Sequence, residues 1–304
     1  MLDKRILITG SGGMLGDALL PIIKSNFTHV LATDIDVNTS CLEKLDVRDI
    51  SQCEKIITSF APDIVIHLAA LTDLEFCEKN SEEAYITNTL GTENMAIFSE
   101  KLRATFVYIS TAGVFDGKKE FYNDFDKPNP INIYGKSKYR GELFVQNHIT
   151  NFYIFRAGWM MGAGPKKDKK FINKIYRQIK NGQKEIFVVE DKLGTPTYTV
   201  DFSKSMLNVI NSGFFGLYNQ VCKGSCNRFD IANAFVKFLN VQDKVKIIKV
   251  KSDYFKKEYF APRPNSEKLI NLKLSQRKMN IMRDWYDCLK EYSEIFQKDL
   301  DEKI

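Results

Sequence analysis

The sequence feature that most constrains the fold is a glycine-rich turn between an apolar strand and a helix. Arg5–Thr9 is short and continuously apolar, as a buried parallel strand is, and Met14–Ser25 has a helical pattern. Without side chains the turn's backbone can approach a pyrophosphate, which the free N–H groups and the helix dipole attract. A tight packing turn is the competing interpretation, but the flanking strand and helix favour nucleotide binding. The predicted cofactor residues are Gly10, Gly13, Met14, Leu15 and Gly16.

The same alternation of strand and helix continues through the first half of the chain. The further predicted strands are Val30–Asp34, Ile64–Leu68, Phe106–Ser110 and Tyr153–Ala157, and the further helices are Ser51–Phe60, Ser81–Lys101 and Tyr134–Asn147. This order predicts an α/β fold, a Rossmann-type doubly wound parallel sheet with right-handed crossovers.

After Gly158 the pattern changes. Predicted helices at Phe171–Asn181, Asp201–Asn211, Asp230–Leu239 and Asp284–Gln297 alternate with strands at Gln183–Glu190 and Val245–Val250, and Thr195–Val200 is expected to return the chain to the core. We therefore expect residues 1–160 to form a dinucleotide-binding domain to which 193–220 return. Residues 161–192 and 221–304 are expected to form a smaller C-terminal substrate-binding lobe.

Composition limits the partners and the location. The 304 residues carry a net charge of +6, which does not by itself indicate nucleic acid and is compatible with an anionic small substrate. The apolar strand near the N-terminus leaves no room for a signal peptide, and no apolar stretch reaches membrane-spanning length. The six cysteines are scattered, and only Cys222 and Cys226 lie close together, without the further ligands of a metal site. We expect a cytoplasmic protein with no membrane partner and no metal.

Acidic residues near the strand ends bear on the choice of cofactor. Asp34 ends the second strand about 20 residues after the turn, where a carboxylate binds the adenosine ribose 2′-hydroxyl. Asp36 adds a second negative charge, so NAD is favoured over NADP, which stays possible. Asp46 and Val47 are predicted to border the adenine, although Asp46 equally fits a cap for the helix near Ser51.

Small residues close the third strand. Leu68, Ala69 and Ala70 leave space for the cofactor at the carboxyl edge of the sheet. We interpret His67 as a core histidine rather than a catalyst. Asn88, within a predicted helix, either holds a water or backbone bend near the site or faces solvent.

The clearest chemical signal is Tyr134-x-x-x-Lys138. In a helix the two side chains lie on one face, one turn apart, and a nearby ammonium favours the phenolate form of a tyrosine. Such a tyrosine can exchange a proton with a substrate oxygen, whereas an ordinary surface helix is the alternative. Thr111 ends the fourth strand, and its hydroxyl is expected in the same cleft.

Taken together, these motifs resemble the extended branch of the short-chain dehydrogenase/reductase superfamily, which acts on nucleotide-linked sugars. Within that branch the chain is most similar to the dTDP-4-dehydrorhamnose reductase group. The segments that carry this similarity are Leu71-Thr72-Asp73, Cys77-Glu78, Asn132 to Lys138, Gly141-Glu142, Arg156 to Trp159, Gly194 to Asp201 and Arg263-Pro264.

The resemblance implies roles for individual residues. Thr111 would bind the substrate carbonyl, Tyr134 would protonate the developing alkoxide, and Lys138 would lower the tyrosine pKa and hold the nicotinamide ribose. Trp159 would line the sugar pocket, with a buried core tryptophan as the alternative. Arg263 would contact the diphosphate, since arginine matches phosphate oxygens, with a structural ion pair as the alternative.

The chain departs from the group directly after Thr111. The group usually has aspartate and tyrosine there, where this chain has Ala112 and Gly113. The departure leaves the hexose open and speaks against a 4,6-dehydratase. A 4-epimerase and a non-catalytic, cofactor-binding regulatory subunit remain alternatives to an NAD(P)H-dependent reductase of a 4-keto-6-deoxy sugar. The superfamily also implies a possible homodimer. The lysines of residues 166–170 form either a solvated tip or a lid for the diphosphate.

Overall fold

The architecture is built on one parallel sheet, as the computed structural model of this chain shows for residues 3–37 and 39–301. Seven strands pair in the order β11-β6-β5-β4-β1-β2-β3, all parallel. Their bounds are β1 Arg5–Thr9, β2 His29–Asp34, β3 Glu43–Lys44, β4 Ile64–His67, β5 Thr105–Thr111, β6 Phe152–Ala157 and β11 Gly216–Asn219. The predicted doubly wound α/β class is confirmed.

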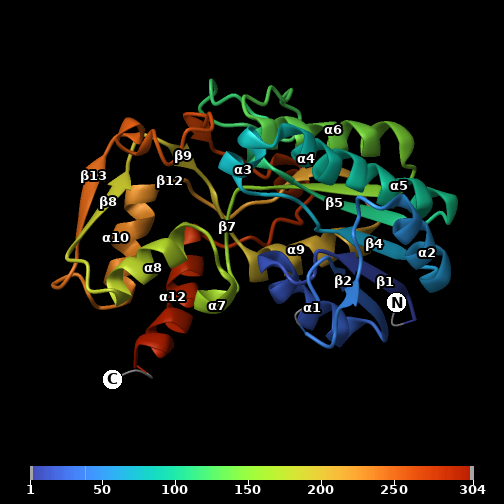
Figure 1. The fold of residues 1–304 in the computed structure, drawn as a ribbon, viewed down its shortest axis with the longest axis horizontal. Coiled ribbons are helices and arrows are strands. Elements are labelled where there is room, and N and C mark those ends of the chain that lie inside the picture. The colour runs from blue at the N-terminus through green and yellow to red at the C-terminus, as the bar shows by residue number, and fades with distance from the viewer. Residues whose placement is uncertain (1–2, 38, 302–304) are drawn as a thin grey trace.

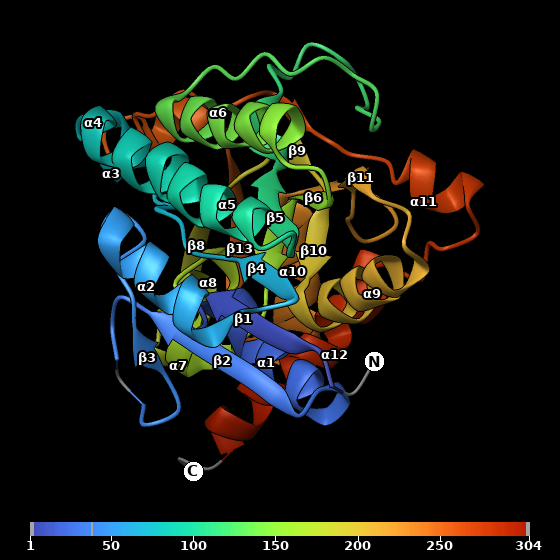
Figure 2. The ribbon, with the colours of Figure 1, turned by 90° about the vertical axis from the view of Figure 1, so that its right-hand side faces the viewer.

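Alternation along the strands separates the two faces of the sheet. Ile6 and Ile8 belong to one buried cluster and Leu7, between them, belongs to another. The helices that cover the first face are α1 (Met14–Asn26) and α9 (Thr199–Ser212). Those on the second are α2 (Ile50–Phe60), α5 (Gly91–Lys101) and α6 (Ile133–His148) (Figure 2). Both faces of the sheet are therefore covered by helices and buried, which explains why the strands are continuously apolar.

Two strands and one helix differ from the sequence-based expectation. β3 is a two-residue exposed pair and β11 begins with a glycine, so neither has an apolar run. The predicted helix Ser81–Lys101 is divided into α4 (Ser81–Tyr85), a π-helical turn (Ile86–Leu90) and α5. The π-turn contains Asn88, and such turns often occur at functional sites.

A second group of elements lies beside the sheet (Figure 1). It includes the strand pair β8 (Glu185–Val189) and β13 (Lys246–Val250), with helices α8 (Phe171–Lys180), α10 (Arg228–Phe238) and α12 (Trp285–Asp301). The segment Thr195–Val200 contains the short strand β10 (Pro196–Tyr198), which pairs with β7 (Trp159–Met161) outside the central sheet. Its last two residues begin α9.

Short strands connect this second group to the sheet edge. β9 (Leu193–Gly194) lies between β12 (Cys226–Asn227) and β14 (Ser266–Glu267). Leu269 bridges to Tyr122, and α11 (Leu272–Gln276) lies beside β11, so this late segment reaches back to the central sheet. Among the described residues no helix is both long and apolar enough to cross a membrane.

A buried ion pair fixes α6 to the sheet. The guanidinium of Arg156, on β6, makes a bidentate contact with the Glu142 carboxylate, Nε–Oε1 2.8 Å and Nη2–Oε2 2.6 Å. The side chains are 3% and 0% exposed. Two buried ions have lost their hydration, and each is compensated by the opposite charge of the other. Removing one of the two charges therefore leaves the other buried without compensation, which is strongly unfavourable.

We predict that Glu142→Gln lowers the free energy of unfolding by about 3–5 kcal/mol, because it leaves the Arg156 charge buried and unpaired. Urea unfolding measures the change. Glu83→Gln is the matched control, since Glu83 pairs with Arg48 at the surface, where such pairs contribute about 0–1 kcal/mol. Equal losses in the two variants would contradict the prediction.

Candidate active site

The glycine turn lies at the carboxyl edge of the sheet. Its glycines differ in whether the fold requires a residue without a side chain at that position. Gly10 has a φ of +68°, and a Cβ built on it would lie 2.5 Å from the Ala69 backbone nitrogen. A Cβ on Gly16 would lie 2.2 Å from the Ser11 carbonyl oxygen. Both glycines are therefore required by the fold. Gly13 is exposed, has a φ of −77°, and a Cβ there meets only the Gly10 carbonyl oxygen, at 3.3 Å.

Gly13 immediately precedes α1, so the first N–H groups of a 13-residue helix follow it. Because the fold itself does not demand a glycine here, the open backbone suits a group that approaches from outside, such as a pyrophosphate. Met14 is partly buried and Leu15 is buried behind the turn. These residues fit a dinucleotide.

Asp34 lies beside the turn, as predicted from its position at the end of β2. Its Oδ2 accepts a hydrogen bond of 2.8 Å from the Gly12 N–H, and its Oδ1 accepts one of 3.1 Å from the Asp36 N–H. The carboxylate therefore helps to shape the turn.

Asp46 and Val47 are held by their own neighbours. Asp46 pairs with Arg48 at 2.7 Å, and this hydrogen-bonded partner lowers the Asp46 pKa. It does not cap α2, because Asp49 does. Val47 is 5% exposed. A Cβ built on Gly91 would lie only 2.8 Å from its Cγ2 atom. Val47 thus packs between α5 and the sheet edge.

His67 is a core residue, as interpreted from the sequence. It is fully buried, and its Nδ1 and Nε2 lie 2.8 and 3.2 Å from the hydroxyls of Thr9 and Thr92. Burial lowers its pKa to about 3, so the ring is neutral. Leu68, Ala69 and Ala70 are partly exposed beside Gly10 at the same strand end.

Asn88 is buried rather than solvent-facing, which decides the alternative left open by the sequence. Its side chain accepts from the Leu71 N–H (2.8 Å) and donates to the Leu71 carbonyl (3.0 Å) and the Ser137 hydroxyl (3.0 Å). Through these contacts the π-turn connects the segment after β4 to α6, the helix that carries Tyr134.

The start of α6 is packed directly on the residue pair that follows Thr111. A Cβ on Gly135 would lie 2.2 Å from the Gly113 carbonyl oxygen, so only glycine allows this approach. Asn132 caps the helix by accepting from the Gly135 N–H at 2.7 Å, and the Ile133 N–H donates to Glu78 Oε2 at 3.0 Å. These contacts place Tyr134 next to the end of β5.

Thr111 and Tyr134 converge, as the sequence predicted. The Thr111 side chain reaches the phenol of Tyr134, and this contact favours the ionised phenol. Burial has the larger, opposite effect and raises the pKa of Tyr134 to about 12. The expected lowering of this pKa by Lys138 is therefore not seen. Burial is the largest effect, and the nearby Cys77 and Glu267 side chains raise the pKa further.

Lys138 lies one turn after Tyr134 but directs its ammonium elsewhere. Its Nζ is 4.1 Å from the centroid of the Tyr108 ring. Burial lowers the pKa of Lys138 to about 7, although the nearby Glu142 carboxylate raises it. The lysine therefore changes its charge near neutral pH.

The two predicted substrate residues on the lobe side make different contacts. Arg263 forms an ion pair with Glu75 (Nη2–Oε1 2.7 Å), which is the structural alternative named above. Trp159 is partly buried, and its Nε1–H donates to Glu267 Oε2 at 2.7 Å. A Cβ on Gly194 would lie 2.4 Å from the indole ring, so the ring lies flush against the β9 backbone.

Two charged residues that the sequence analysis missed lie at this site. The Glu267 carboxylate oxygen Oε1 is 3.6 Å from a Cβ position on Gly113. The guanidinium of Arg228 lies 3.8 Å from the centre of the Trp159 ring and 4.9 Å from that of Phe171. Neither residue belongs to a motif with a chemical spacing, and only the fold brings them to Thr111.

The lysine-rich segment does not form a free tip. Gly164–Lys167 is the short helix α7. Lys167 pairs with Asp17 at 2.6 Å, and Lys170 Nζ donates to the hydroxyl and carbonyl of Thr72 at 3.0 and 3.2 Å. Both lysines thus connect residues 164–170 to the sheet side of the molecule.

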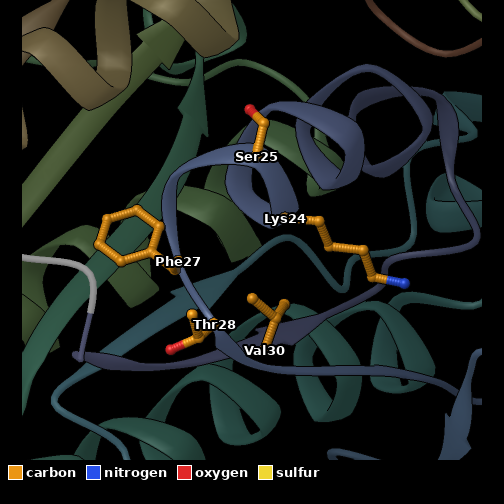
Figure 3. A pocket seen from close by; sticks show the side chains of 5 residues that line it. All are labelled: Lys24, Ser25, Phe27, Thr28 and Val30. Carbon is orange, nitrogen blue, oxygen red and sulfur yellow. The ribbon is translucent and has the colours of Figure 1, made fainter.

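Away from this edge the structure contains surface pockets but, among the described residues, no candidate metal cluster. A shallow pocket of about 340 Å³ is lined by Lys24, Ser25, Phe27, Thr28 and Val30 (Figure 3), at the end of α1 and the start of β2. It lies at the opposite strand end from the glycine turn. Within residues 3–37 and 39–301, no three His, Cys, Asp or Glu side chains are grouped to hold a metal.

A parallel Rossmann sheet, a glycine turn on its carboxyl edge, and Thr111, Tyr134 and Lys138 beside that turn define the class of the extended short-chain dehydrogenases/reductases. The chain belongs to the family described as the RmlD substrate binding domain, whose model matches residues 4–298.

Three proteins show how close this relationship is. The chain is similar to the crystal structure of a dTDP-4-dehydrorhamnose reductase from Clostridium acetobutylicum, with 34% identity, coverage of 96% of this chain and 99% of that one, and a TM-score of 0.88. It is also similar to the structure of a dTDP-4-dehydrorhamnose reductase from Bacillus anthracis in complex with NADP. Here the identity is 32%, the coverage is 95% of this chain and 98% of that one, and the TM-score is 0.86. The methionine adenosyltransferase 2 subunit beta of Danio rerio is 26% identical over 243 residues, which are 78% of this chain and 75% of that protein.

We predict that Gly13→Ala weakens binding of the dinucleotide at least about tenfold, or about 1.4 kcal/mol, while the protein stays folded. Its φ of −77° is open to alanine, so the methyl group mainly occupies space next to the helix N-terminus. Calorimetric titration with NADH and NADPH measures the affinity, and a thermal melt checks folding. Gly10→Ala is the contrasting variant, expected to lose the fold. Unchanged affinity in folded Gly13→Ala would remove the turn from the cofactor site.

Proposed function

We propose that this chain is an NAD(P)H-dependent reductase of a nucleotide-linked 4-keto-6-deoxy sugar, related in function to dTDP-4-dehydrorhamnose reductase. The observation that carries the proposal is that the side chains of Thr111 and Tyr134 meet at the strand edge that also holds the open glycine turn. The family match and the two reductases that share about a third of its sequence support the same activity.

In the proposed reaction the bound nicotinamide supplies a hydride to the carbonyl carbon. Thr111 donates a hydrogen bond to the carbonyl oxygen and orients it. Tyr134 then transfers its phenolic proton to the same oxygen as negative charge develops there. A pKa near 12 keeps this phenol protonated at neutral pH, so the resting side chain is the acid that a reduction needs. Lys138, one turn along, is proposed to bind the nicotinamide ribose with its ammonium.

The cofactor is proposed to lie across the turn, with Asp34 near the adenosine ribose. Because the carboxylate disfavours a 2′-phosphate, NADH is our first choice, while the relative with NADP makes NADPH the second. The lobe formed by 161–192 and 221–304 is proposed to hold the sugar and its diphosphate. Arg228, which has no ion pair among the described residues, suits the diphosphate better than Arg263. We propose a cytoplasmic, homodimeric enzyme without a nucleic-acid partner.

Two alternatives are kept because they make different predictions. A 4-epimerase needs the same threonine and tyrosine but returns its hydride to the sugar. The similarity to a methionine adenosyltransferase subunit favours a non-catalytic, cofactor-binding role. The paired hydroxyls of Thr111 and Tyr134 support catalysis, since a binding subunit does not need them.

The test is the absorbance of NADH or NADPH with a panel of nucleotide-linked 4-keto-6-deoxy sugars. We expect net consumption of reduced cofactor, and a loss on the order of 10² or more in kcat for Tyr134→Phe, because that variant has no phenolic proton to transfer. Tyr139→Phe, on the same helix, is the control. Turnover without net consumption would indicate an epimerase, and silence across the panel would favour the regulatory subunit.

The reaction should also depend on the charge of Lys138. An ammonium with a lowered pKa is charged below about pH 7 and neutral above it, whereas Tyr134 stays protonated through this range. We therefore expect kcat/KM for the reduced cofactor to fall as the pH rises through about 7. Lys138→Met should lack this inflection, and Lys136→Met, at an exposed position of the same helix, should keep it. A flat wild-type profile from pH 6 to 8.5 would contradict the assignment.

A further inference from the structure

Directly after Thr111 the chain presents almost no side chain, because Ala112 and Gly113 follow it. A methyl group built on Gly113 would lie 3.4 Å from the Thr111 hydroxyl oxygen and 3.6 Å from Glu267 Oε1. A carboxylate from a segment more than 150 residues away thus borders the same small space as the Thr111 hydroxyl.

Glu267 is fixed in this place by backbone pairing. It belongs to β14, which pairs in parallel with β9 and places Glu267 opposite Gly194. The Trp159 ring lies against that same glycine and donates its N–H to Glu267 Oε2. One carboxylate oxygen is therefore occupied and oriented, while Oε1 has no hydrogen bond among the described residues.

The electrostatic surroundings leave this carboxylate in need of donors. Burial raises the pKa of Glu267, while the Trp159 hydrogen bond and the charges of Arg228, Arg263 and Lys192 lower it. None of these cations lies within ion-pair distance: Arg228 is stacked on Trp159, and Arg263 is paired with Glu75. Glu267 is only partly buried, so its Oε1 is open to a hydrogen-bond donor from outside the chain.

We propose that Glu267 binds the hydroxyl on the ring carbon next to the reacting carbonyl, and so selects a sugar that carries this hydroxyl. The inference rests on the proposed reductase function. The carbonyl oxygen lies at Thr111 and Tyr134, and the oxygen on the neighbouring ring carbon is the substrate donor closest to it. Glu267 Oε1 faces the same point as the Thr111 hydroxyl, which suits that donor.

The proposal predicts discrimination against a sugar without the hydroxyl. A site built to hydrogen-bond a substrate group rejects the analogue that lacks it, because its own polar atom is left unpaired. For the wild type we expect kcat/KM to be at least about 10²-fold higher for a nucleotide-linked 4-keto-6-deoxyhexose than for its 3-deoxy analogue.

The decisive measurement is this ratio in Glu267 variants. Glu267→Gln keeps an acceptor for Trp159 and should reduce the ratio at least about tenfold. Glu267→Ala should bring it close to one, mainly by losing activity on the hydroxylated sugar. Glu185→Gln, an exposed acid in the same part of the molecule, is the matched control and should keep the wild-type ratio. Thermal melts of all variants show whether they remain folded.

The outcomes separate the two proposals. If the wild type reduces both sugars and the ratio is unchanged in folded Glu267→Gln and Glu267→Ala, Glu267 is only a support for Trp159 and the inference is overturned while the reductase stands. If the wild type reduces neither sugar, both proposals are rejected. A ratio that falls in both Glu267 variants, but not in Glu185→Gln, supports the assignment.

Discussion

The site depends on the contact between two backbones, where the first turn of α6 meets the end of β5. Gly135 and Gly113 approach so closely that a single methyl group on Gly135 would overlap the Gly113 carbonyl. Helix and strand therefore have only one relative position, and it brings the Tyr134 hydroxyl to Thr111. The Asn132 cap and the buried Glu142–Arg156 pair maintain the same position from the two ends of the contact. The close approach of the two main chains thus determines where the Tyr134 side chain lies relative to Thr111.

This tight packing also determines the charge of each side chain. Burial shifts the pKa values of Tyr134, Lys138 and His67, and each moves toward its neutral form. The buried Glu142 carboxylate instead has the Arg156 guanidinium as its partner. A neutral phenol next to a lysine of variable charge favours protonation of a substrate oxygen over abstraction of a proton. The dense packing that positions Tyr134 therefore also keeps its phenol protonated.

The sequence predicted much of this arrangement because local patterns carry it. The parallel sheet follows from apolar strands such as Ile64–Leu68, and the grouping of Thr111, Tyr134 and Lys138 follows from strand ends and helical spacing. β3 and β11 were missed because edge strands need no apolar run. The pKa of Tyr134 was mispredicted because spacing gives the neighbour of a side chain but not its burial. Asn88 was undecided, since only the fold shows that Leu71 and Ser137 face it.

Glu267 and Arg228 illustrate the part of a site that no local pattern contains. Glu267 ends the two-residue strand β14, Arg228 begins α10, and neither has a partner at a fixed spacing. Glu267 is placed by the pairing of β14 with β9, and Arg228 by its stacking on Trp159, which lies against Gly194 on β9. Thr111 and Tyr134 are held by the central sheet and the helix packed on it, whereas these two charges come from the segments that pack beside the sheet. The part of the site that local patterns predict and the part that they miss therefore belong to different parts of the fold.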